Sequence, residues 1–253
     1  MCYICILFLQ SQKPNFMKFK LDLVQPCYNP SPNWDKNLCE HFEKLQALLP
    51  DYQIHLLVIN DGSLRNVNEE HVEFLQKNIP NFQYISYSEN QGKGFAMRTA
   101  IKKTTSDFII YTDIDFPFEL EGIVKIVEKL AAGVQVVAGV RDESYYQNLS
   151  AQRRLLSRVS KLLNLIFLKI PFTDTQSGLK GMNSEGRKLF LQTTVKRFLF
   201  DTEFLSMAAR KKLRLETVTI RLRKGILYST MSWKVVLQEV GNFAKILLKS
   251  VFS

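Results

Sequence analysis

The chain has 253 residues, of which 46% are hydrophobic and 23% are charged, as is usual for globular proteins. This length can bury a substantial core, as one large domain or as two small ones. The sequence has no internal repeat and no low-complexity linker, which excludes a repeat protein and argues against a true second domain.

The net charge of +10 is distributed unevenly. Residues 1–148 carry 14 Lys and Arg against 18 Asp and Glu, a net charge of −4, whereas residues 149–253 carry 20 against 6, a net charge of +14. A basic C-terminal half indicates an anionic partner: nucleic acid, acidic lipid or a phosphorylated substrate. Because the sequence contains no known nucleic-acid-binding motif, we do not expect nucleic acid to be that partner.

All four cysteines lie within the first forty residues. Cys2 and Cys5 form a Cys-x-x-Cys pair, but no second pair or histidine cluster lies near it, which argues against a zinc site. Cysteine usage therefore favours a reduced, cytosolic setting.

Up to residue 140, apolar strands alternate with amphipathic helices. A period of two predicts a strand over 18–24, and Leu38, Phe42 and Leu45 share one face of a helix predicted over 33–49. We expect further strands at 54–59, 82–87, 107–113 and 134–140, and further helices at 66–78, from the turn at 90–94 to residue 103, and at 119–130. This order predicts an α/β protein with a mainly parallel, Rossmann-like sheet and helices on both faces.

After residue 141 the pattern changes. We expect a long helix over 149–170, a polar passage over 172–182, a short helix from a Ser184 cap to 192, a helix over 201–212 and an amphipathic C-terminal helix over 233–251. The segment 213–222 alternates like a strand, and its phase slips near 216–217, which indicates a β-bulge.

Two carboxylates follow the strand predicted at 107–113. Asp113 and Asp115 are two residues apart, so they share a face on extended backbone and can converge on one cation. Mg²⁺ and Mn²⁺ favour oxygen ligands, and Mg²⁺ takes one or two carboxylates together with water and substrate phosphate. Ligands of open α/β sheets gather at the carboxyl ends of the strands. The pair therefore indicates a metal–diphosphate site, with an ordinary acidic turn as the alternative.

Two other turns follow predicted strands. Asp61, in Asp61-Gly62-Ser63, has the chemistry to accept hydrogen bonds from a base or a ribose, although a plain turn is the favoured interpretation of this motif in isolation. Gly92 and Gly94 open a helix whose free N–H groups would favour an anion, with a simple strand-to-helix turn as the alternative. The spacing fits neither a P-loop nor a dinucleotide fingerprint.

Taken in order, these pieces resemble glycosyltransferase family 2, and within it the dolichyl- and polyprenyl-phosphate sugar transferases. The resemblance runs from about residue 18 to 235. It is carried by Pro26-Cys27-Tyr28-Asn29, Asn60-Asp61-Gly62-Ser63, Asn90-Gln91-Gly92-Lys93-Gly94, Asp113-Ile114-Asp115 and Gly139-Val140-Arg141, with Asp174-Thr175-Gln176-Ser177-Gly178-Leu179-Lys180 and Phe200-Asp201-Thr202-Glu203-Phe204 supporting the lipid-phosphate branch.

The resemblance implies a GT-A fold over 17–231, a nucleotide-sugar donor, and a divalent metal, Mg²⁺ or Mn²⁺, that joins Asp113 and Asp115 to the diphosphate. By the same resemblance, the nucleotide pocket and its neighbouring turn would be formed by Pro26, Tyr28, Asn29, Asp61, Gly92 and Lys93. Arg141 and Arg154 would handle phosphates, and Asp174 and Gln176 would line the sugar and acceptor site.

Three positions depart from the family pattern. Pro30 stands where an acidic residue follows Tyr-Asn, Asn60 replaces the first of two paired aspartates, and Pro117 stands where this branch often has glutamine. Pro117 removes a metal ligand or a support for one, which bears on metal affinity and donor preference. A non-catalytic nucleotide-sugar-binding homologue is therefore the alternative from a different functional class.

The acceptor decides the mechanism. A polyprenyl phosphate brings an oxygen that is already anionic, so no general base is required. A glycan or glycolipid hydroxyl requires a carboxylate base, for which Asp201 and Asp174 are the candidates. Asp201 and Glu203 are also explained as acids at a helix N-terminus, which the helix dipole favours. The family expectation is inversion at the anomeric carbon.

The basic helix over 149–170 bears on where the protein works. Arg153, Arg154, Arg158 and Lys161 would face anionic headgroups if the helix lay on a membrane, although a core helix with a solvated basic edge also fits. The helix at 232–253 has a similar character, and neither is a convincing spanning segment. We expect peripheral attachment to the cytoplasmic face of the membrane.

The N-terminal segment 1–16 is expected to be a non-native or disordered tail. Residues 1–10 are apolar but too short to span a bilayer, and they lack the basic region and cleavage site of a signal peptide. Met17 begins a strand-like run and is our expected natural start. Mass spectrometry of the native N-terminus checks this: we expect a mature chain that starts at Met17, and a peptide covering residues 5–13 would contradict it.

Overall fold

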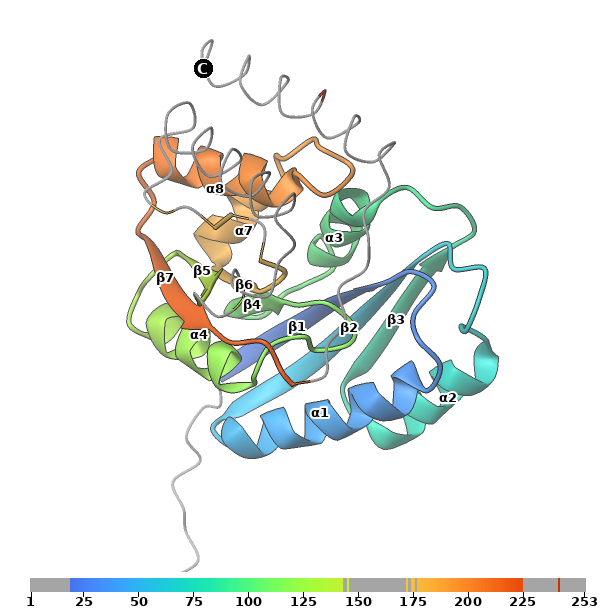
Figure 1. The fold of residues 1–253 in the computed structure, drawn as a ribbon. Helices are drawn as coiled ribbons and strands as arrows, with labels where there is room; N and C mark the ends of the chain where they lie inside the picture. The colour runs from blue at the N-terminus through green and yellow to red at the C-terminus, as the bar shows by residue number, and fades with distance from the viewer. Residues whose placement is uncertain are drawn as a thin grey trace, which may run out of the picture.

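The computed structural model describes residues 19–142, 145, 172, 174–175, 177–224 and 241. Within these residues seven strands form one sheet in the order β3-β2-β1-β4-β6-β5-β7 (Figure 1). The strands are β1 (Phe19–Cys27), β2 (Tyr52–Asp61), β3 (Phe82–Tyr87), β4 (Phe108–Tyr111), β5 (Val136–Arg141), β6 (Lys180–Asn183) and β7 (Leu215–Ile220).

The sheet is mainly parallel, as predicted. β1 pairs in parallel with β2 and β4, β2 with β3, and β5 with β7, whereas β6 runs antiparallel to both β4 and β5. β6 is not predictable from the sequence pattern, because its four residues include a lysine and a glycine and form no apolar run. Gly181 is needed there, since a Cβ would collide with the Ile126 side chain of the covering helix.

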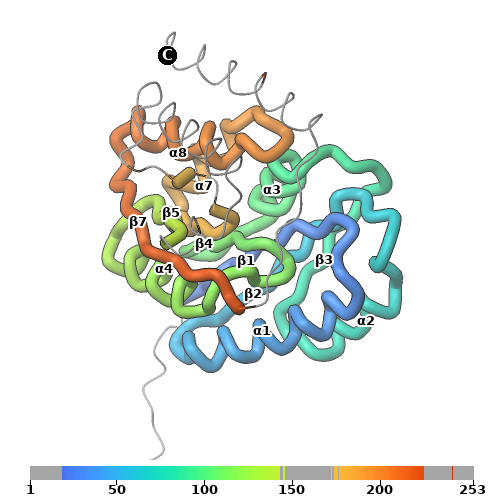
Figure 2. The backbone as a smooth tube through the Cα atoms, viewed as in Figure 1, coloured from blue at the N-terminus to red at the C-terminus, as the bar shows by residue number. Residues whose placement is uncertain are grey.

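Helices cover both faces of the sheet, as predicted (Figures 1 and 2). On one face α1 (Trp34–Leu48), α2 (Glu69–Asn78) and α4 (Glu121–Ala131) bury Leu38, Leu75 and Ile126 against the strands. On the other face α3 (Lys93–Ile101), α7 (Ser184–Phe190) and α8 (Phe200–Arg210) bury Met97, Phe190 and Phe204. The two apolar clusters explain why the central strand β4 is apolar and buried throughout.

Two local predictions are wrong. Asn183, not Ser184, caps α7, because its side-chain oxygen accepts hydrogen bonds from the N–H groups of Glu185 (3.0 Å) and Gly186 (3.1 Å). The bulge expected at 216–217 is absent, since β7 stays in continuous register with β5. β7 is an edge strand whose first three residues are only half-buried, so its apolar positions do not alternate strictly.

The helices predicted at 149–170 and 233–251 lie outside the described residues. Among the residues that the structure describes, no helix is both long enough and apolar enough to cross a membrane.

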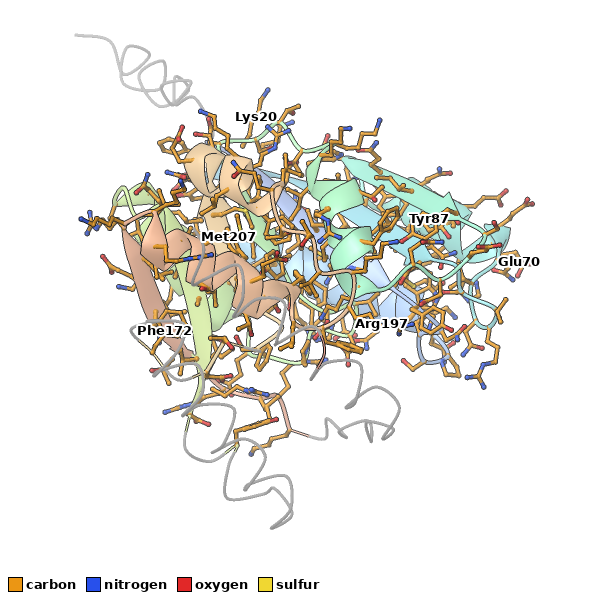
Figure 3. The ribbon with its side chains drawn as sticks, turned by 90° about the horizontal axis from the view of Figure 1, so that it is seen from above. Lys20, Glu70, Tyr87, Phe172, Arg197 and Met207 are labelled. Carbon is orange, nitrogen blue, oxygen red and sulfur yellow. The ribbon has the colours of Figure 1, made fainter. Side chains whose placement is uncertain are left out.

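The parallel strands bring several loops to one end of the sheet. β1, β2 and β4 run in the same direction, so the loops after Cys27, Asp61 and Tyr111 emerge together at the carboxyl edge. Lys20, near the start of β1, lies well apart from Arg197, which is in a loop at the carboxyl edge (Figure 3). The sequence motifs therefore meet at one end.

A buried carboxylate ties the other end together. Asp22 of β1 accepts hydrogen bonds from the backbone N–H groups of Thr105 and Ser106 (both 3.0 Å), and it bonds Nδ1 of His55 at 2.9 Å. Burial raises the pKa of Asp22, but the hydrogen bonds from these donors together lower it by more, so the pKa lies below its ordinary value. The ionised carboxylate therefore fixes the turn that leads into β4.

Replacing Asp22 by Asn is expected to lower the free energy of unfolding by about 1–3 kcal/mol at neutral pH. Because the folded-state pKa is depressed, the stabilisation by Asp22 is complete above the unfolded pKa of about 3.9 and disappears as the pH falls through the folded pKa. Urea unfolding at several pH values should therefore show wild type and variant converging in acid. The exposed Asp51→Asn is the control, and a difference that is independent of pH would contradict the assignment.

Candidate active site

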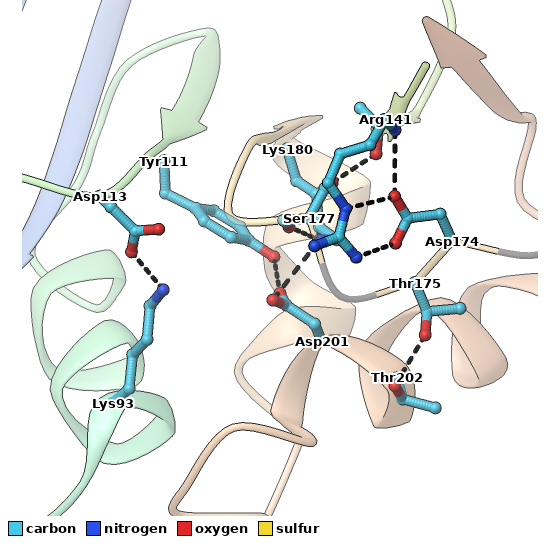
Figure 4. Close-up of polar contacts among 11 residues, drawn as sticks. Lys93, Tyr111, Asp113, Arg141, Asp174, Thr175, Ser177, Lys180, Asp201 and Thr202 are labelled. Carbon is cyan, nitrogen blue, oxygen red and sulfur yellow. Dashed lines mark hydrogen bonds and ion pairs between the residues drawn. The ribbon is translucent and has the colours of Figure 1, made fainter. Parts of the chain in front are cut away.

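The loop after β4 carries Asp113 and Asp115. Its start is fixed to β1: Thr112 N donates to Val24 O (3.2 Å), and Gln25 Nε2 donates to the carbonyl oxygen of Asp113 (3.1 Å). The carboxylate of Asp113 forms an ion pair with the ammonium of Lys93, from the first turn of α3 (Figure 4). The pair predicted from sequence therefore lies at the carboxyl edge and faces a lysine.

The charges around this loop suit a cation. Burial and the neighbouring charge of Asp113 raise the pKa of Asp115. Burial lowers the pKa of Lys93, but Asp113, Asp201 and Asp115 raise it by more. Lys93 thus places one positive charge beside these carboxylates.

The carboxylates of Asp113 and Asp115 fit a magnesium or manganese ion that takes its remaining ligands from water and substrate. Within the described part of the chain, no three His, Cys, Asp or Glu side chains gather into a site. Asp113 and Asp115 would therefore hold the ion, and water and phosphate oxygens would complete its coordination, as is typical for Mg²⁺.

Gly178 lets another segment lie directly against Asp113. A Cβ at this position would collide with Oδ2 of Asp113, so a larger residue would displace this carboxylate. The backbone at Gly178, within the predicted stretch 174–180, therefore lies against the first of the two carboxylates.

Asp174 and Arg141 were predicted separately, and the structure brings them together. Nε and Nη2 of Arg141 donate to Asp174 at 2.8 and 2.6 Å, and the Arg141 backbone N–H donates at 3.0 Å (Figure 4). Burial raises the pKa of Asp174, but Arg141 lowers it by more. This buried, bidentate pair keeps Asp174 ionised and fully engaged.

Asp201 is buried in the first turn of α8. The hydroxyl of Tyr111 donates to its Oδ1, and Nζ of Lys180 lies 3.4 Å from its Oδ2. Lys180 is inaccessible to solvent and also donates to the carbonyl oxygen of Ser177. Burial raises the pKa of Asp201 and lowers the pKa of Lys180. Tyr111 and Lys180 were not predicted as site residues, because no local sequence pattern shows that a side chain is buried or that it pairs with a distant acid.

Glu203, two residues further along the first turn of α8, has a structural role. Its carboxylate accepts hydrogen bonds from the backbone N–H groups of Thr194 and Val195, both at 2.8 Å. It therefore fixes the loop before α8, in keeping with the structural alternative for this acid.

Asp61 is buried, and its oxygens are used inside the protein. They accept hydrogen bonds from the hydroxyl of Tyr87 (2.7 Å), Nδ2 of Asn90 (2.9 Å) and the backbone N–H groups of Gln91 (2.8 Å) and Gly92 (3.0 Å). Burial and the carboxylate raise the pKa of Tyr87. Asp61 therefore shapes the 90–92 turn beside the site.

The N-terminus of α3 is closed by a loop from the second half of the chain. Gly92 has φ +100°, and a Cβ there would lie 2.6 Å from the carbonyl oxygen of Lys196, while Gly94 touches Val195. That Lys196 oxygen accepts the Phe95 N–H at 3.1 Å. One of the N–H groups that we expected to be free for an anion is thus already bonded.

The end of β1 presents the remaining predicted residues. Asn29 adopts φ 45°, and its side-chain oxygen accepts hydrogen bonds from Leu64 N (2.8 Å) and Arg65 N (3.1 Å), so it joins two loops. Pro26 lies in register with Ile59, and Tyr28 is 50% exposed. Tyr28 is therefore the side chain of this group that is open to a ligand. Gln176 and Arg154 lie outside the described residues.

Comparisons with known proteins agree with this architecture. Residues 22–190 match the model of glycosyl transferase family 2. Bactoprenol glucosyl transferase of Shigella phage SfX is 31% identical over 127 residues, which cover 49% of this chain and 40% of the relative. Dolichyl-phosphate beta-glucosyltransferase of Drosophila melanogaster is 26% identical over 216 residues, which cover 80% of this chain and 66% of the relative. The chain thus spans between two fifths and two thirds of these relatives.

Solved structures share the fold at low sequence identity. Glucosyl-3-phosphoglycerate synthase from Mycobacterium tuberculosis, in complex with Mn²⁺, UDP and glucosyl-3-phosphoglycerate, superposes with a TM-score of 0.59 at 16% identity and covers 92% of this chain and 78% of its own. A UDP complex of the same enzyme gives 0.62. The GT-A fold is confirmed, and since the family match extends over more than half of the sequence, the chain belongs to glycosyl transferase family 2.

Proposed function

We propose that this chain transfers a hexose from a nucleotide sugar, linked to UDP or GDP, to a polyprenyl or dolichyl phosphate with inversion. The observation that carries the choice of acceptor is the engagement of both candidate bases. Asp174 is held by the fork of Arg141, and Asp201 by Tyr111 and Lys180. An acceptor hydroxyl would need one of them as a general base, whereas a lipid phosphate brings its own anionic oxygen.

The donor is proposed to bind at the carboxyl edge of β1, β2 and β4. Exposed Tyr28 would lie against the base, and the turn shaped by Asp61 would lie beside the sugar diphosphate. Asp113 and Asp115 would hold Mg²⁺ or Mn²⁺, which supplies positive charge to the departing diphosphate when bound. Lys93 would place a second positive charge on the same side.

The acceptor phosphate is proposed to meet the donor from the opposite side of the sugar. Arg141, whose orientation Asp174 fixes, and Arg154 would hold it, and Asp174 and Gln176 would line the sugar pocket. The relatives named bactoprenol and dolichyl-phosphate glucosyltransferases support this choice of acceptor class.

A transfer assay tests the proposal. Purified protein, Mn²⁺ or Mg²⁺, labelled UDP- and GDP-sugars and a short polyprenyl phosphate should give label in the organic phase, and Asp115→Ala should abolish it. Loss of a required general base typically costs about 10²–10⁴-fold in rate. We therefore expect folded Asp201→Asn to lose less than this. The double variant Lys180→Met, Asp201→Asn removes both buried charges and controls for destabilisation.

Three results would contradict the proposal in different ways. Donor hydrolysis without organic label would move the acceptor to a hydroxyl. A loss above a hundredfold in folded Asp201→Asn would make Asp201 the base. No turnover of any donor would favour a non-catalytic binding module, with Pro117→Gln as the first reversion to test.

We also propose that the protein binds peripherally to the cytoplasmic face of the membrane. The net charge of +14 over residues 149–253 supports this, because a basic surface is attracted to anionic headgroups. Sedimentation with anionic vesicles at low salt should carry the protein down, and vesicles of neutral lipid should not. A chain that stayed in the supernatant with anionic vesicles would contradict the proposal.

A further inference from the structure

Arg223 contacts the main chain of the loop that carries the two carboxylates. It lies in the short segment after β7, which runs from the sheet toward α1 (Figures 1 and 2). Its Nη2 donates to the carbonyl oxygen of Asp115 at 2.6 Å, and its Nε donates to the carbonyl oxygen of Phe116. Its backbone N–H donates to Pro117 O at 3.0 Å. One residue thus bonds three successive carbonyl groups.

The backbone around Arg223 reinforces this contact. Phe118 and Leu222 form an antiparallel bridge, and Glu119 N donates to the carbonyl oxygen of Arg221 at 2.9 Å. The segment 221–223 therefore lies alongside the loop as a short partner strand.

The loop needs such support because its own conformation is unfavourable. Phe116 has φ 45°, in the left-handed region that costs a bulky residue about 1–3 kcal/mol. Pro117, which stands where the family often has glutamine, has no N–H to donate. Within the loop, Phe116 N donates to Asp113 O at 3.0 Å. Contacts from outside must hold the remaining carbonyls.

His41 of α1 orients the guanidinium. Its Nδ1 lies 2.7 Å from the carbonyl oxygen of Asn37, which can only accept, so Nδ1 carries the proton. Nε2 is then an acceptor, and it receives Nη1 of Arg223 at 2.6 Å. Burial, together with the charge of Arg223, lowers the pKa of His41 and favours this neutral form. The imidazole also stacks on the buried ring of Phe116, with centroids 5.4 Å apart.

We propose that Arg223, oriented by His41, is the positioning residue that fixes the Asp113–Pro117 loop and so aligns the carboxylates of Asp113 and Asp115. The planar fork of arginine reaches two carbonyl oxygens and the imidazole together, which a lysine cannot do. The ligand of the aligned carboxylates, a divalent cation with a nucleoside diphosphate, rests on the proposed function. The fixing of the loop is inferred from the contacts of Arg223 and His41 and does not depend on the proposed function.

The variants that test this are Arg223→Ala, Arg223→Lys and His41→Phe. Arg223→Lys keeps the charge but loses the fork, and His41→Phe keeps a ring on Phe116 but loses the acceptor. Arg221→Ala is the matched control, because Arg221 is on the same segment, its side chain is 72% exposed, and its guanidinium lies near Asp142 instead of the loop. The lysine and phenylalanine variants keep the test possible if the alanine variant does not fold.

Amide hydrogen exchange, measured without metal, reports directly on how firmly the Asp113–Pro117 loop is held. We expect the amides of residues 113–116 and 118 to exchange faster in Arg223→Ala than in wild type. The increase should be smaller in Arg223→Lys and His41→Phe and absent in Arg221→Ala. The affinity for Mn²⁺, measured in the presence of UDP and separately of GDP, tests whether the carboxylates of Asp113 and Asp115 are aligned. Removing groups that orient metal ligands typically costs about 10–100-fold in affinity, which is the rise in Mn²⁺ dissociation constant expected for Arg223→Ala.

Unchanged exchange over 113–118 in the Arg223 variants would overturn the proposal. So would faster exchange with a Mn²⁺ affinity within twofold of wild type, because the loop would then move without disturbing the carboxylates. A third outcome is faster exchange in the Arg223 variants together with a wild-type protein that does not bind Mn²⁺ with either UDP or GDP. That result would support the fixing of the loop by Arg223 and would contradict the proposed function.

Discussion

A buried charge must be paired inside the protein, and this requirement organises the carboxyl edge of the sheet. Leaving one partner of a buried ion pair alone costs about 3–5 kcal/mol, so each acid placed there needs donors. Asp61 takes them from the 90–92 turn, Asp174 from Arg141, and Asp201 from Tyr111 and Lys180. Asp113 takes one from Lys93, but Asp115 lies two residues away on the same loop, and the charge of Asp113 helps to raise the pKa of Asp115. Negative charge therefore accumulates at one place, where a cation is favoured.

The same pairing limits the chemistry. An acid that is locked to an arginine or lysine orients its partner, and it is a poor acceptor of a substrate proton. The site is thus better suited to positioning anionic groups than to activating a neutral hydroxyl. Catalysis of that kind depends on fixed charges that are in place before reaction, which the rigid pairs supply. The basic second half of the sequence has the complementary character for a phosphate-bearing lipid.

The second half of the chain builds much of the site by closing over the first half. Gly178 allows the 177–179 backbone to touch Asp113, and Gly92 allows the carbonyl of Lys196 to close the start of α3. Arg223 reaches the far side of the Asp113–Pro117 loop from beyond β7. The Asp113–Pro117 loop is therefore held by segments that follow it by about 60 to 110 residues. In each case the contact is to a backbone atom or depends on the absence of a side chain.

The sequence by itself determined the alternation of strands and helices, the mainly parallel sheet and the position of Asp113 and Asp115 at the end of β4, because hydrophobic period and strand order are local properties. It did not predict β6, whose Lys180 and Gly181 make sense only between β4 and β5, nor the Asn183 cap of α7. It named Asp174, Arg141 and Asp201 but could not pair them. Only the tertiary structure decided that Asp61 and Asn29 shape turns, and that His41 and Arg223, 182 residues apart, meet beside the Asp113–Pro117 loop. The physical reason is that such hydrogen bonds join residues with no fixed spacing along the chain, so folding alone brings them within reach.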